Sequence, residues 1–230
     1  MIRVHIAMVG LNRSLSFTGA SIQRKIVQPL RRMPLFSPSF QAELIVPPGG
    51  EVENPRSGEF GHIESEIPAD FASWNVNYLP QEEALKHAGE MGVRVSHPRG
   101  DWGDDGRSWR NFLTYLAALD LAFEQDKNLP EADVVVLIRP DIAIMDRLNL
   151  AFWLTLVFLW SRWVREIVVV PNWGRFRGVN DRFAILTRGA VERYMRRLRR
   201  TEDFFRDHPE NNSEVFLKHT LRGSKVLEVI

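Results

Sequence analysis

The sequence contains no cysteine. Disulfides, cysteine-based zinc sites, iron–sulfur clusters and thiol catalysis are therefore excluded, and the composition is compatible with a reducing compartment. A large excess of charge of one sign is also missing, because the formal net charge at pH 7 is only +1. No global electrostatic field therefore favours nucleic acid or an anionic membrane, and we expect no nucleic-acid partner.

Long apolar runs are missing as well. The most apolar segment, LAFWLTLVFLW at 150–160, is too short to span a bilayer, which needs about 20 apolar residues. We expect a core helix or strand there. Tryptophans beside arginines, at Trp153, Trp160 and Trp163, leave open a membrane-surface or partner-binding role. No secretory signal is visible, and we expect a cytoplasmic protein, with peripheral membrane association as the alternative.

Several common site motifs are absent. The sequence has no GxxxxGK[ST] loop, no GxGxxG fingerprint after the first predicted strand, and no HExxH, GxSxG or EF-hand pattern. The six histidines show no metal-ligand spacing. The remaining candidates are arginines, which bind phosphate oxygens, and carboxylates, which bind divalent metals or act as bases.

The sequence does contain a regular alternation of predicted strands and helices. Alternating or continuous apolar runs predict the strands, and apolar residues at helical spacing predict the helices. The expected strands are 2–10, 42–48, 93–98, 133–139, 166–171, the start of 181–200 and the terminal KVLEVI. The expected helices are one that includes Ile22, Ile26 and Leu30 and is ended by Pro34 and Pro38, and then 81–88, 108–125, the rest of 181–200, and 213–222.

This alternation predicts an α/β fold with a mostly parallel central sheet and helices on both faces. The length of 230 residues suits a single domain over 1–230. Residues 49–80 are rich in Gly, Pro, Asn and Ser, and they predict an irregular excursion within that domain. Long excursions of this kind often serve as lids or binding loops.

Polar residues follow three of the predicted strands. The first strand leads into GLNRS, the 133–139 strand into RPD, and the 166–171 strand into NWGRFRGVND. Ligands of open α/β sheets bind outside the carboxyl ends of the strands. Unpaired charges inside the core would be costly, and Pro140 disfavours continued strand pairing. We therefore expect a group of residues to converge at that edge: Arg13, Arg139, Asp141, Asn180 and Asp181.

Three segments in this order resemble a family of small glycosyltransferases of the GT-A fold, found in bacterial surface-polysaccharide clusters and in some large DNA viruses. They are RPD after a hydrophobic strand, GVNDRFAI at 178–185, and NNSEVFLKHTLR at 211–222. The loop with Arg13 and Ser14 and the helix at 108–125 add to the resemblance. It implies a GT-A-like (Rossmann-like) sheet and transfer of a sugar from a nucleotide-sugar donor to a saccharide or lipid-linked acceptor in polysaccharide biosynthesis.

The resemblance also implies how the donor is bound. In GT-A enzymes a D-x-D motif binds the ribose and, through Mn²⁺ or Mg²⁺, the diphosphate. The matching position reads Arg139-Pro140-Asp141, so Asp141 is the expected metal ligand and Arg139 replaces the first acid. A guanidinium takes over part of the charge neutralisation, which leaves the metal requirement open. Arg13 and Arg110 are further candidates for donor-binding cations.

Sugar transfer also needs a base that deprotonates the acceptor hydroxyl, while negative charge builds on the leaving diphosphate. Asp181 is the candidate general base. Asn180 would orient the acceptor or the base. Glu214, at the start of a late helix, is a candidate acceptor ligand or alternative base.

Each residue also has an ordinary structural interpretation. Asp141 would be a turn or cap residue, Asp181 an Asx-turn carboxylate, and Glu214 a helix first-turn acid. Arg110 would form a salt bridge on a helix surface. The arginines at 193–200 are expected to face solvent, with an anionic lipid-linked acceptor or a membrane surface as the alternative contact.

Two other functions stay open. One is a nucleotidyltransferase on a similar sheet, although GLNRSLSFTG is a poor match to the glycine-rich and basic loop of that class. The other is a non-catalytic nucleotide-binding or assembly protein, which the missing first acid of RPD supports. No obligate protein partner is evident from the sequence.

Overall fold

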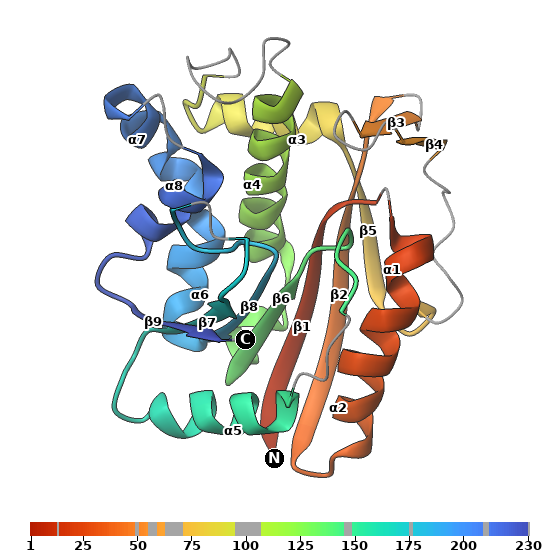
Figure 1. The fold of residues 1–230 in the computed structure, drawn as a ribbon, viewed down its shortest axis with the longest axis vertical. Helices are drawn as coiled ribbons and strands as arrows, with labels where there is room; N and C mark the ends of the chain where they lie inside the picture. Colours follow the sequence, from red (N-terminus) through yellow and green to blue (C-terminus); the bar gives the residue numbers. More distant parts are fainter. Residues whose placement is uncertain are drawn as a thin grey trace.

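Seven strands of the protein form one mixed sheet (Figure 1). The computed structural model describes residues 1–12, 14–48, 51–54, 59–62, 71–94, 107–144, 149–174, 177–208 and 212–229. The strands are β1 (Ile2–Leu11), β2 (Phe36–Val46), β5 (Asn75–Pro80), β6 (Val134–Ile138), β7 (Ile167–Pro171), β8 (Phe183–Thr187) and β9 (Lys225–Val229). Their order is β5-β2-β1-β6-β8-β7-β9, and β8 runs antiparallel to both of its neighbours. The predicted α/β fold with a mostly parallel sheet is confirmed.

Helices cover both faces of the sheet (Figure 1). One face carries α1 (Leu15–Ile22), the π-helical turn η1 (Gln23–Val27), α2 (Gln28–Arg32) and α5 (Leu150–Trp160). The other carries α3 (Gln81–Glu90), α4 (Arg107–Gln125), α6 (Arg188–Met195), the 3-10 helix η5 (Arg196–Arg200), α7 (Thr201–Asp207) and α8 (Ser213–Thr220). A short 3-10 turn, η4 (Leu129–Glu131), precedes β6.

The central strand β6 shows why its sequence is apolar throughout. Val134, Val136 and Ile138 pack into the core on one face of the sheet. Val135 and Leu137 pack into the core on the other face. All five residues are buried, as expected for a strand covered by helices on both sides.

The first helical segment is continuous but irregular. Ile22, Ile26 and Leu30 are fully buried, as their spacing predicts. The segment widens into the π-helical turn just before Pro29, whose ring cannot donate a hydrogen bond to the preceding turn. Pro38 was wrongly expected to help end this helix, because it lies within β2. β5 pairs with β2 only from Gln41 onward, and a strand tolerates proline where a neighbouring strand is missing.

Two other expectations need correction. The 49–80 excursion contains an antiparallel strand pair, β3 (Glu51–Asn54) with β4 (Glu59–His62), and it ends in the edge strand β5. The sequence of β5 shows no clear alternation of apolar and polar residues, because this edge strand leaves most of its residues exposed or half-buried. The strand expected at 93–98 is absent at Val93 and Arg94, and its other residues lie outside the described ranges.

The arginines at 193–200 form the solvated face expected from the sequence only in part, because Arg199 and Arg200 are exposed but the others are half-buried or buried. Arg197 is fully buried, and Arg193 pairs with Glu166 (2.8 Å). Arg196 and Arg199 converge on the buried carboxylate of Asp120 in α4.

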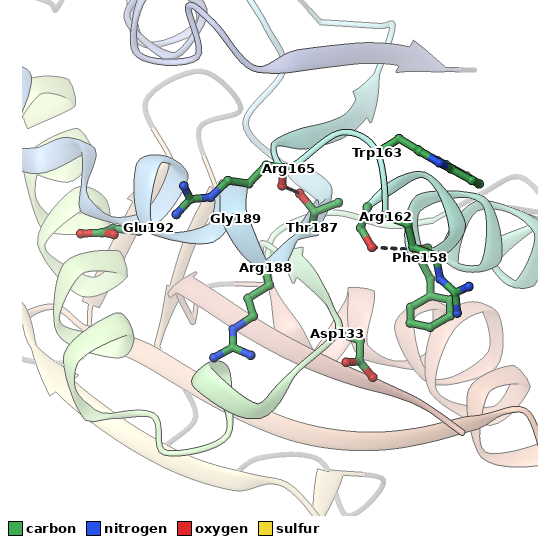
Figure 2. Close-up of a pocket in the computed structure, with 10 residues that line it drawn as sticks. Asp133, Phe158, Arg162, Trp163, Arg165, Thr187, Arg188, Gly189 and Glu192 are labelled. Carbon is green, nitrogen blue, oxygen red and sulfur yellow. Dashed lines mark hydrogen bonds between the residues drawn. The ribbon is translucent and has the colours of Figure 1, made fainter.

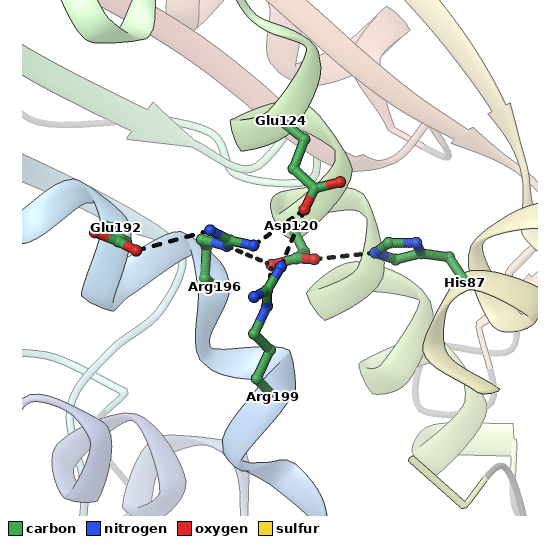
Figure 3. Close-up of polar contacts among 6 residues, drawn as sticks. All are labelled: His87, Asp120, Glu124, Glu192, Arg196 and Arg199. Carbon is green, nitrogen blue, oxygen red and sulfur yellow. Dashed lines mark hydrogen bonds and ion pairs between the residues drawn. The ribbon is translucent and has the colours of Figure 1, made fainter. Parts of the chain in front are cut away.

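Figure 3 shows this network. One Asp120 oxygen lies 3.0 Å from His87 Nε2, and the other lies 3.4 Å from Arg196 Nε and 3.7 Å from Arg199 Nε. Glu124 accepts from both arginines, at 3.1 and 3.0 Å. The network therefore joins α3, α4 and η5.

None of the helices in the described ranges has the length and apolar content needed to cross a bilayer.

We expect Asp120→Asn to lower the free energy of unfolding by about 2 to 4 kcal/mol, because it removes a buried negative charge that three cationic or polar side chains surround. Denaturant unfolding of both proteins would measure the difference. Glu131→Gln is the matched control, since its exposed pair with Arg3 should contribute within about 0.5 kcal/mol. Equal effects of the two substitutions would contradict a stabilising role for the network.

Candidate active site at the carboxyl edge of the sheet

The carboxyl edge of the sheet gathers segments that are far apart in the sequence. β1 and β6 run parallel, so both end at this edge. β8 runs antiparallel to β6 and therefore begins there. The backbone N–H of Arg139 donates to the carbonyl of Arg182 (3.0 Å), which fixes the RPD segment beside the residues that lead into β8. The predicted convergence of these two segments is observed.

Arg139 is held by two carboxylates at this edge. Its Nε and Nη2 atoms donate to the two carboxylate oxygens of Asp141, at 3.0 and 2.7 Å. Its Nη1 atom lies 3.6 Å from Asp181 Oδ1. The side chains of Arg139, Asp141 and Asp181 are 24, 11 and 5 % exposed. Burial by itself lowers the pKa of Arg139, but attraction to Asp141 and Asp181 outweighs it and raises that pKa above its ordinary value.

Tyr115 forms the wall behind this cluster. The Arg139 guanidinium lies over its ring, with 5.3 Å between Cζ and the ring centroid. The Tyr115 hydroxyl donates to the carbonyl of Asp181 (3.1 Å), so α4 supports the start of β8. Arg197 contacts the same ring (5.5 Å), and its Nη1 donates to the carbonyl of Tyr194 (2.7 Å). Burial raises the pKa of Tyr115, which keeps its hydroxyl protonated as a donor.

The sequence analysis missed Tyr115 and Arg197. Tyr115 lies within the helix predicted at 108–125 and was counted neither as core nor as site. Arg197 was placed on a solvated face. No local pattern in the sequence marks either residue, because both become important through contacts between α4, η5 and the start of β8.

Asn180 holds its own loop together. Its side-chain N–H donates to the carbonyl of Trp173 (2.6 Å), and its side-chain oxygen accepts from the N–H of Arg182 (2.8 Å). The residue is fully buried. Asn180 therefore acts as an Asx-turn residue that fixes Asp181, which agrees with the alternative that it orients the base, and a contact with an acceptor stays a prediction.

The same loop packs tightly on the start of α8. The N–H of Val179 donates to the carbonyl of Glu214 (2.9 Å). A Cβ atom on Gly178 would lie only 1.9 Å from the backbone carbonyl carbon of Glu214. Only glycine therefore allows this approach, which places Glu214 near Asp181.

Glu214 is a buried carboxylate in the first turn of α8, where the helix dipole favours acids. The helix is capped by Asn212, whose side chain accepts from the N–H of Val215 (3.0 Å). The carboxylate accepts from the Ser213 hydroxyl (2.8 Å). Burial raises the pKa of Glu214, and the nearby charge of Asp181 adds to the increase. The site therefore holds two neighbouring carboxylates in different environments.

The two remaining candidate cations are Arg13 and Arg110. Arg13 lies outside the described residues. Arg110 is exposed near the start of α4, and the Thr114 hydroxyl donates to its backbone carbonyl (2.6 Å). The predicted contact of Arg110 with a donor stays a prediction.

The described residues do not fit a divalent metal at Asp141. Both of its carboxylate oxygens bind Arg139, so a metal would have to displace a two-pronged ion pair. Within the described ranges, no group of three or more His, Asp or Glu side chains is arranged to hold a metal.

One more carboxylate was missed by the sequence analysis. Glu43 is buried within β2, and both of its oxygens accept from the side-chain N–H group of Asn77 in β5, at 2.8 and 3.0 Å. Burial raises the pKa of Glu43 to about 7, although the Asn77 hydrogen bond opposes the increase and Glu83 adds to it. An acid in the middle of the apolar stretch AELIV was the available signal.

No protein-family model matches this chain, and no curated protein matches it either.

We expect Gly178→Ala to lower the free energy of unfolding by about 2 kcal/mol or more, because the new methyl group overlaps the backbone of α8. Thermal and denaturant unfolding would measure this. Gly89→Ala in α3 is the matched control, since nothing lies within 4 Å of its added Cβ, and it should stabilise by up to about 1 kcal/mol. Similar effects at both positions would contradict the close packing at Gly178.

Glu43 also predicts a pH dependence of stability. The folded state keeps a proton on Glu43 that the unfolded state loses between pH 4.5 and about 7. The free energy of unfolding should therefore fall as the pH rises through this range, by at most about 1.4 kcal/mol per pH unit. Glu43→Gln should remove this part of the fall, whereas the exposed Glu82→Gln should retain it. Parallel pH profiles for wild type and Glu43→Gln would contradict the prediction.

Proposed function

We propose that the chain is a glycosyltransferase that moves a sugar from a nucleotide-sugar donor to a hydroxyl group of a saccharide or lipid-linked acceptor. The observation that carries the proposal is the cluster of Arg139, Asp141, Asp181 and Glu214 at the carboxyl edge of the sheet. Open α/β sheets bind their ligands at this edge. Sugar transfer from a diphosphate needs a cation for the leaving group and a carboxylate base for the acceptor, and the cluster supplies both.

The topology of the sheet supports a GT-A-like assignment. When the strands of the main sheet are counted in chain order, they lie in the order 3-2-1-4-6-5-7. The sixth strand, β8, is antiparallel and is inserted beside the strand that delivers RPD. This insertion brings GVNDRFAI next to RPD, which are the two segments on which the resemblance rests.

Arg139 is the proposed donor-binding cation. Asp141 orients its guanidinium through two hydrogen bonds. The Nη1 atom lies 3.6 Å from Asp181, which is longer than a hydrogen bond, so its N–H groups can donate to a diphosphate oxygen. In the proposed reaction, Arg139 therefore neutralises the negative charge that develops on the leaving diphosphate. A requirement for Mn²⁺ or Mg²⁺ remains a prediction that the binding experiment below tests.

In the proposed reaction the bond between the anomeric carbon and the diphosphate oxygen breaks, and a bond from that carbon to the acceptor oxygen forms. The acceptor hydroxyl proton passes to a carboxylate. Asp181 was the first candidate, but its carboxylate lies 3.6 Å from Arg139 Nη1, the group proposed to bind the diphosphate. Burial raises the pKa of Glu214, which favours proton acceptance, and we assign the role to Glu214 with Asp181 beside it.

The closed ion pair between Arg139 and Asp141 also favours a second candidate function. Both carboxylate oxygens of Asp141 already accept from Arg139, and such an ion pair suits a purely structural role as well as a catalytic one. A non-catalytic nucleotide-binding or assembly protein would keep such a clamp without using a base. The nucleotidyltransferase alternative gains no comparable observation from the described residues.

We expect Glu214→Gln to retain donor binding and to lower the release of nucleoside diphosphate from a sugar nucleotide by about 100-fold or more, because the amide cannot accept the proton. Thermal unfolding with a panel of nucleoside diphosphates and sugar nucleotides, with and without Mn²⁺, identifies the donor through the rise in Tm. Glu82→Gln, on the exposed side of α3, should behave as wild type.

The same panel separates the alternatives. Arg139→Lys should lose most of the rise in Tm, since lysine cannot pair with Asp141 in two prongs and still face a diphosphate. Binding that Mn²⁺ strengthens and Asp141→Asn abolishes would restore Asp141 as a metal ligand. A rise in Tm with a nucleotide but without turnover would favour the non-catalytic alternative. If Glu214→Gln kept near-normal turnover and Asp181→Asn lost it, Asp181 would be the base. No response to any nucleotide would overturn the proposal.

A further inference from the structure

Helix α5 is far more apolar than its packing requires. Its sequence, LAFWLTLVFLW, contains no charged residue. Only Leu150, Leu154 and Val157 are buried among its residues. The side chain of Asn149 caps the helix by accepting from the N–H of Phe152 (3.2 Å). A helix that is apolar on all sides is normally buried, so the outer face of α5 is suited to a partner.

The outer face of α5 and the turn after it carry large exposed apolar side chains. Phe152 is 52 % exposed and Trp163 is 78 % exposed. Leu159, Trp160 and Val164 are also exposed. Monomeric soluble proteins rarely leave an apolar group of this kind contiguous on the surface, and such groups mark membrane or protein contacts. We refer to residues 152–164 as the α5 face.

Arginines line a pocket of about 600 Å³ beside the α5 face (Figure 2). Phe158 and Trp163 belong to both the pocket and the face. Arg162, Arg165 and Arg188 line the pocket, and none of them pairs with a carboxylate in the described part of the chain.

The acids of the pocket are already engaged elsewhere. Asp133 accepts from the backbone N–H of Arg3 (2.8 Å) and pairs with its guanidinium (3.3 Å). Glu192 lies 3.7 Å from Arg196. The pocket therefore presents cationic groups whose charge is not neutralised by its own acids.

This charge pattern decides between the possible occupants. A second copy of the chain, docked face to face on a two-fold axis, would bring the three arginines of one copy toward those of the other. The engaged acids could not offset that repulsion. An anionic bilayer surface matches both properties, because tryptophan and phenylalanine insert at the headgroup boundary and arginines attract anionic headgroups.

We propose that the α5 face, with Arg162, Arg165 and Arg188, docks on the surface of a bilayer that contains anionic lipid. The aromatic side chains lie at the headgroup boundary, and the guanidinium groups contact lipid phosphates. The contact is peripheral, because α5 packs on a folded domain and only its outer side meets the bilayer. It does not depend on the glycosyltransferase proposal. Among the arginines of 193–200, first considered for such a contact, Arg196 and Arg199 are engaged in the Asp120 network instead.

Co-sedimentation with vesicles tests the proposal. The full chain should bind vesicles of equal parts phosphatidylcholine and phosphatidylglycerol, and should bind phosphatidylcholine vesicles much less. Raised salt should weaken the binding, since it screens the headgroup attraction. Trp163→Ser should lower the partition coefficient by about tenfold. Replacing Arg162 and Arg165 by Gln should lower it by about fivefold for each arginine.

Matched controls keep the test specific. Phe17→Ser removes an exposed aromatic side chain on α1, and Arg24→Gln removes an exposed arginine of η1; both should bind vesicles as wild type does. The side chains at all of these positions are exposed, and far-ultraviolet circular dichroism confirms that each variant is folded. Absent binding, or equal losses in the control variants, would overturn the proposal. A dimer in lipid-free solution that Trp163→Ser abolishes would assign the face to a second copy and would also overturn it.

Discussion

The Arg139 guanidinium, held between Asp141 and Asp181, is the interaction on which the carboxyl edge depends. It joins the end of β6 to the start of β8, two segments about 40 residues apart in the chain that the sheet alone brings together. Removing one partner from a buried charge cluster costs about 3 to 5 kcal/mol because it leaves an uncompensated charge. The cluster thus stabilises the edge and at the same time presents a cation to it, so its structural and chemical roles are not separable.

Backbone contacts rather than charges set the distance between the two carboxylates of the site. Gly178 lets the loop before β8 lie directly on the first turn of α8, and Asn180 locks that loop on Trp173. Glu214 therefore faces Asp181 from another element. Burial and the nearby charge of Asp181 both raise the pKa of Glu214, so the two carboxylates of the site lie in different environments, as a division of roles between two similar groups requires.

The sequence predicted the parts of this arrangement that depend on strand order. A charged RPD after a fully apolar strand had to lie at an edge, and the segment before β8 had to meet it there. It did not predict Tyr115, Arg197 or Glu43, because each acquires its role from a contact across elements that no local pattern encodes. The same limit applies to Asn180, because the sequence alone does not show whether a polar residue next to a candidate base contacts a ligand or holds its own loop together.

The two edges of the sheet have opposite characters, and this bears on the acceptor. The polar cluster lies at the carboxyl edge, and α5 lies across the amino-terminal end of the sheet (Figure 1). From Ile2 to Met8, which is level with Ile138, β1 alone spans about 20 Å. If the α5 face rests on a bilayer, the proposed site opens away from it. A short lipid-linked saccharide could not then reach Glu214 from the same membrane, so the acceptor would be a long glycan or a saccharide free in solution.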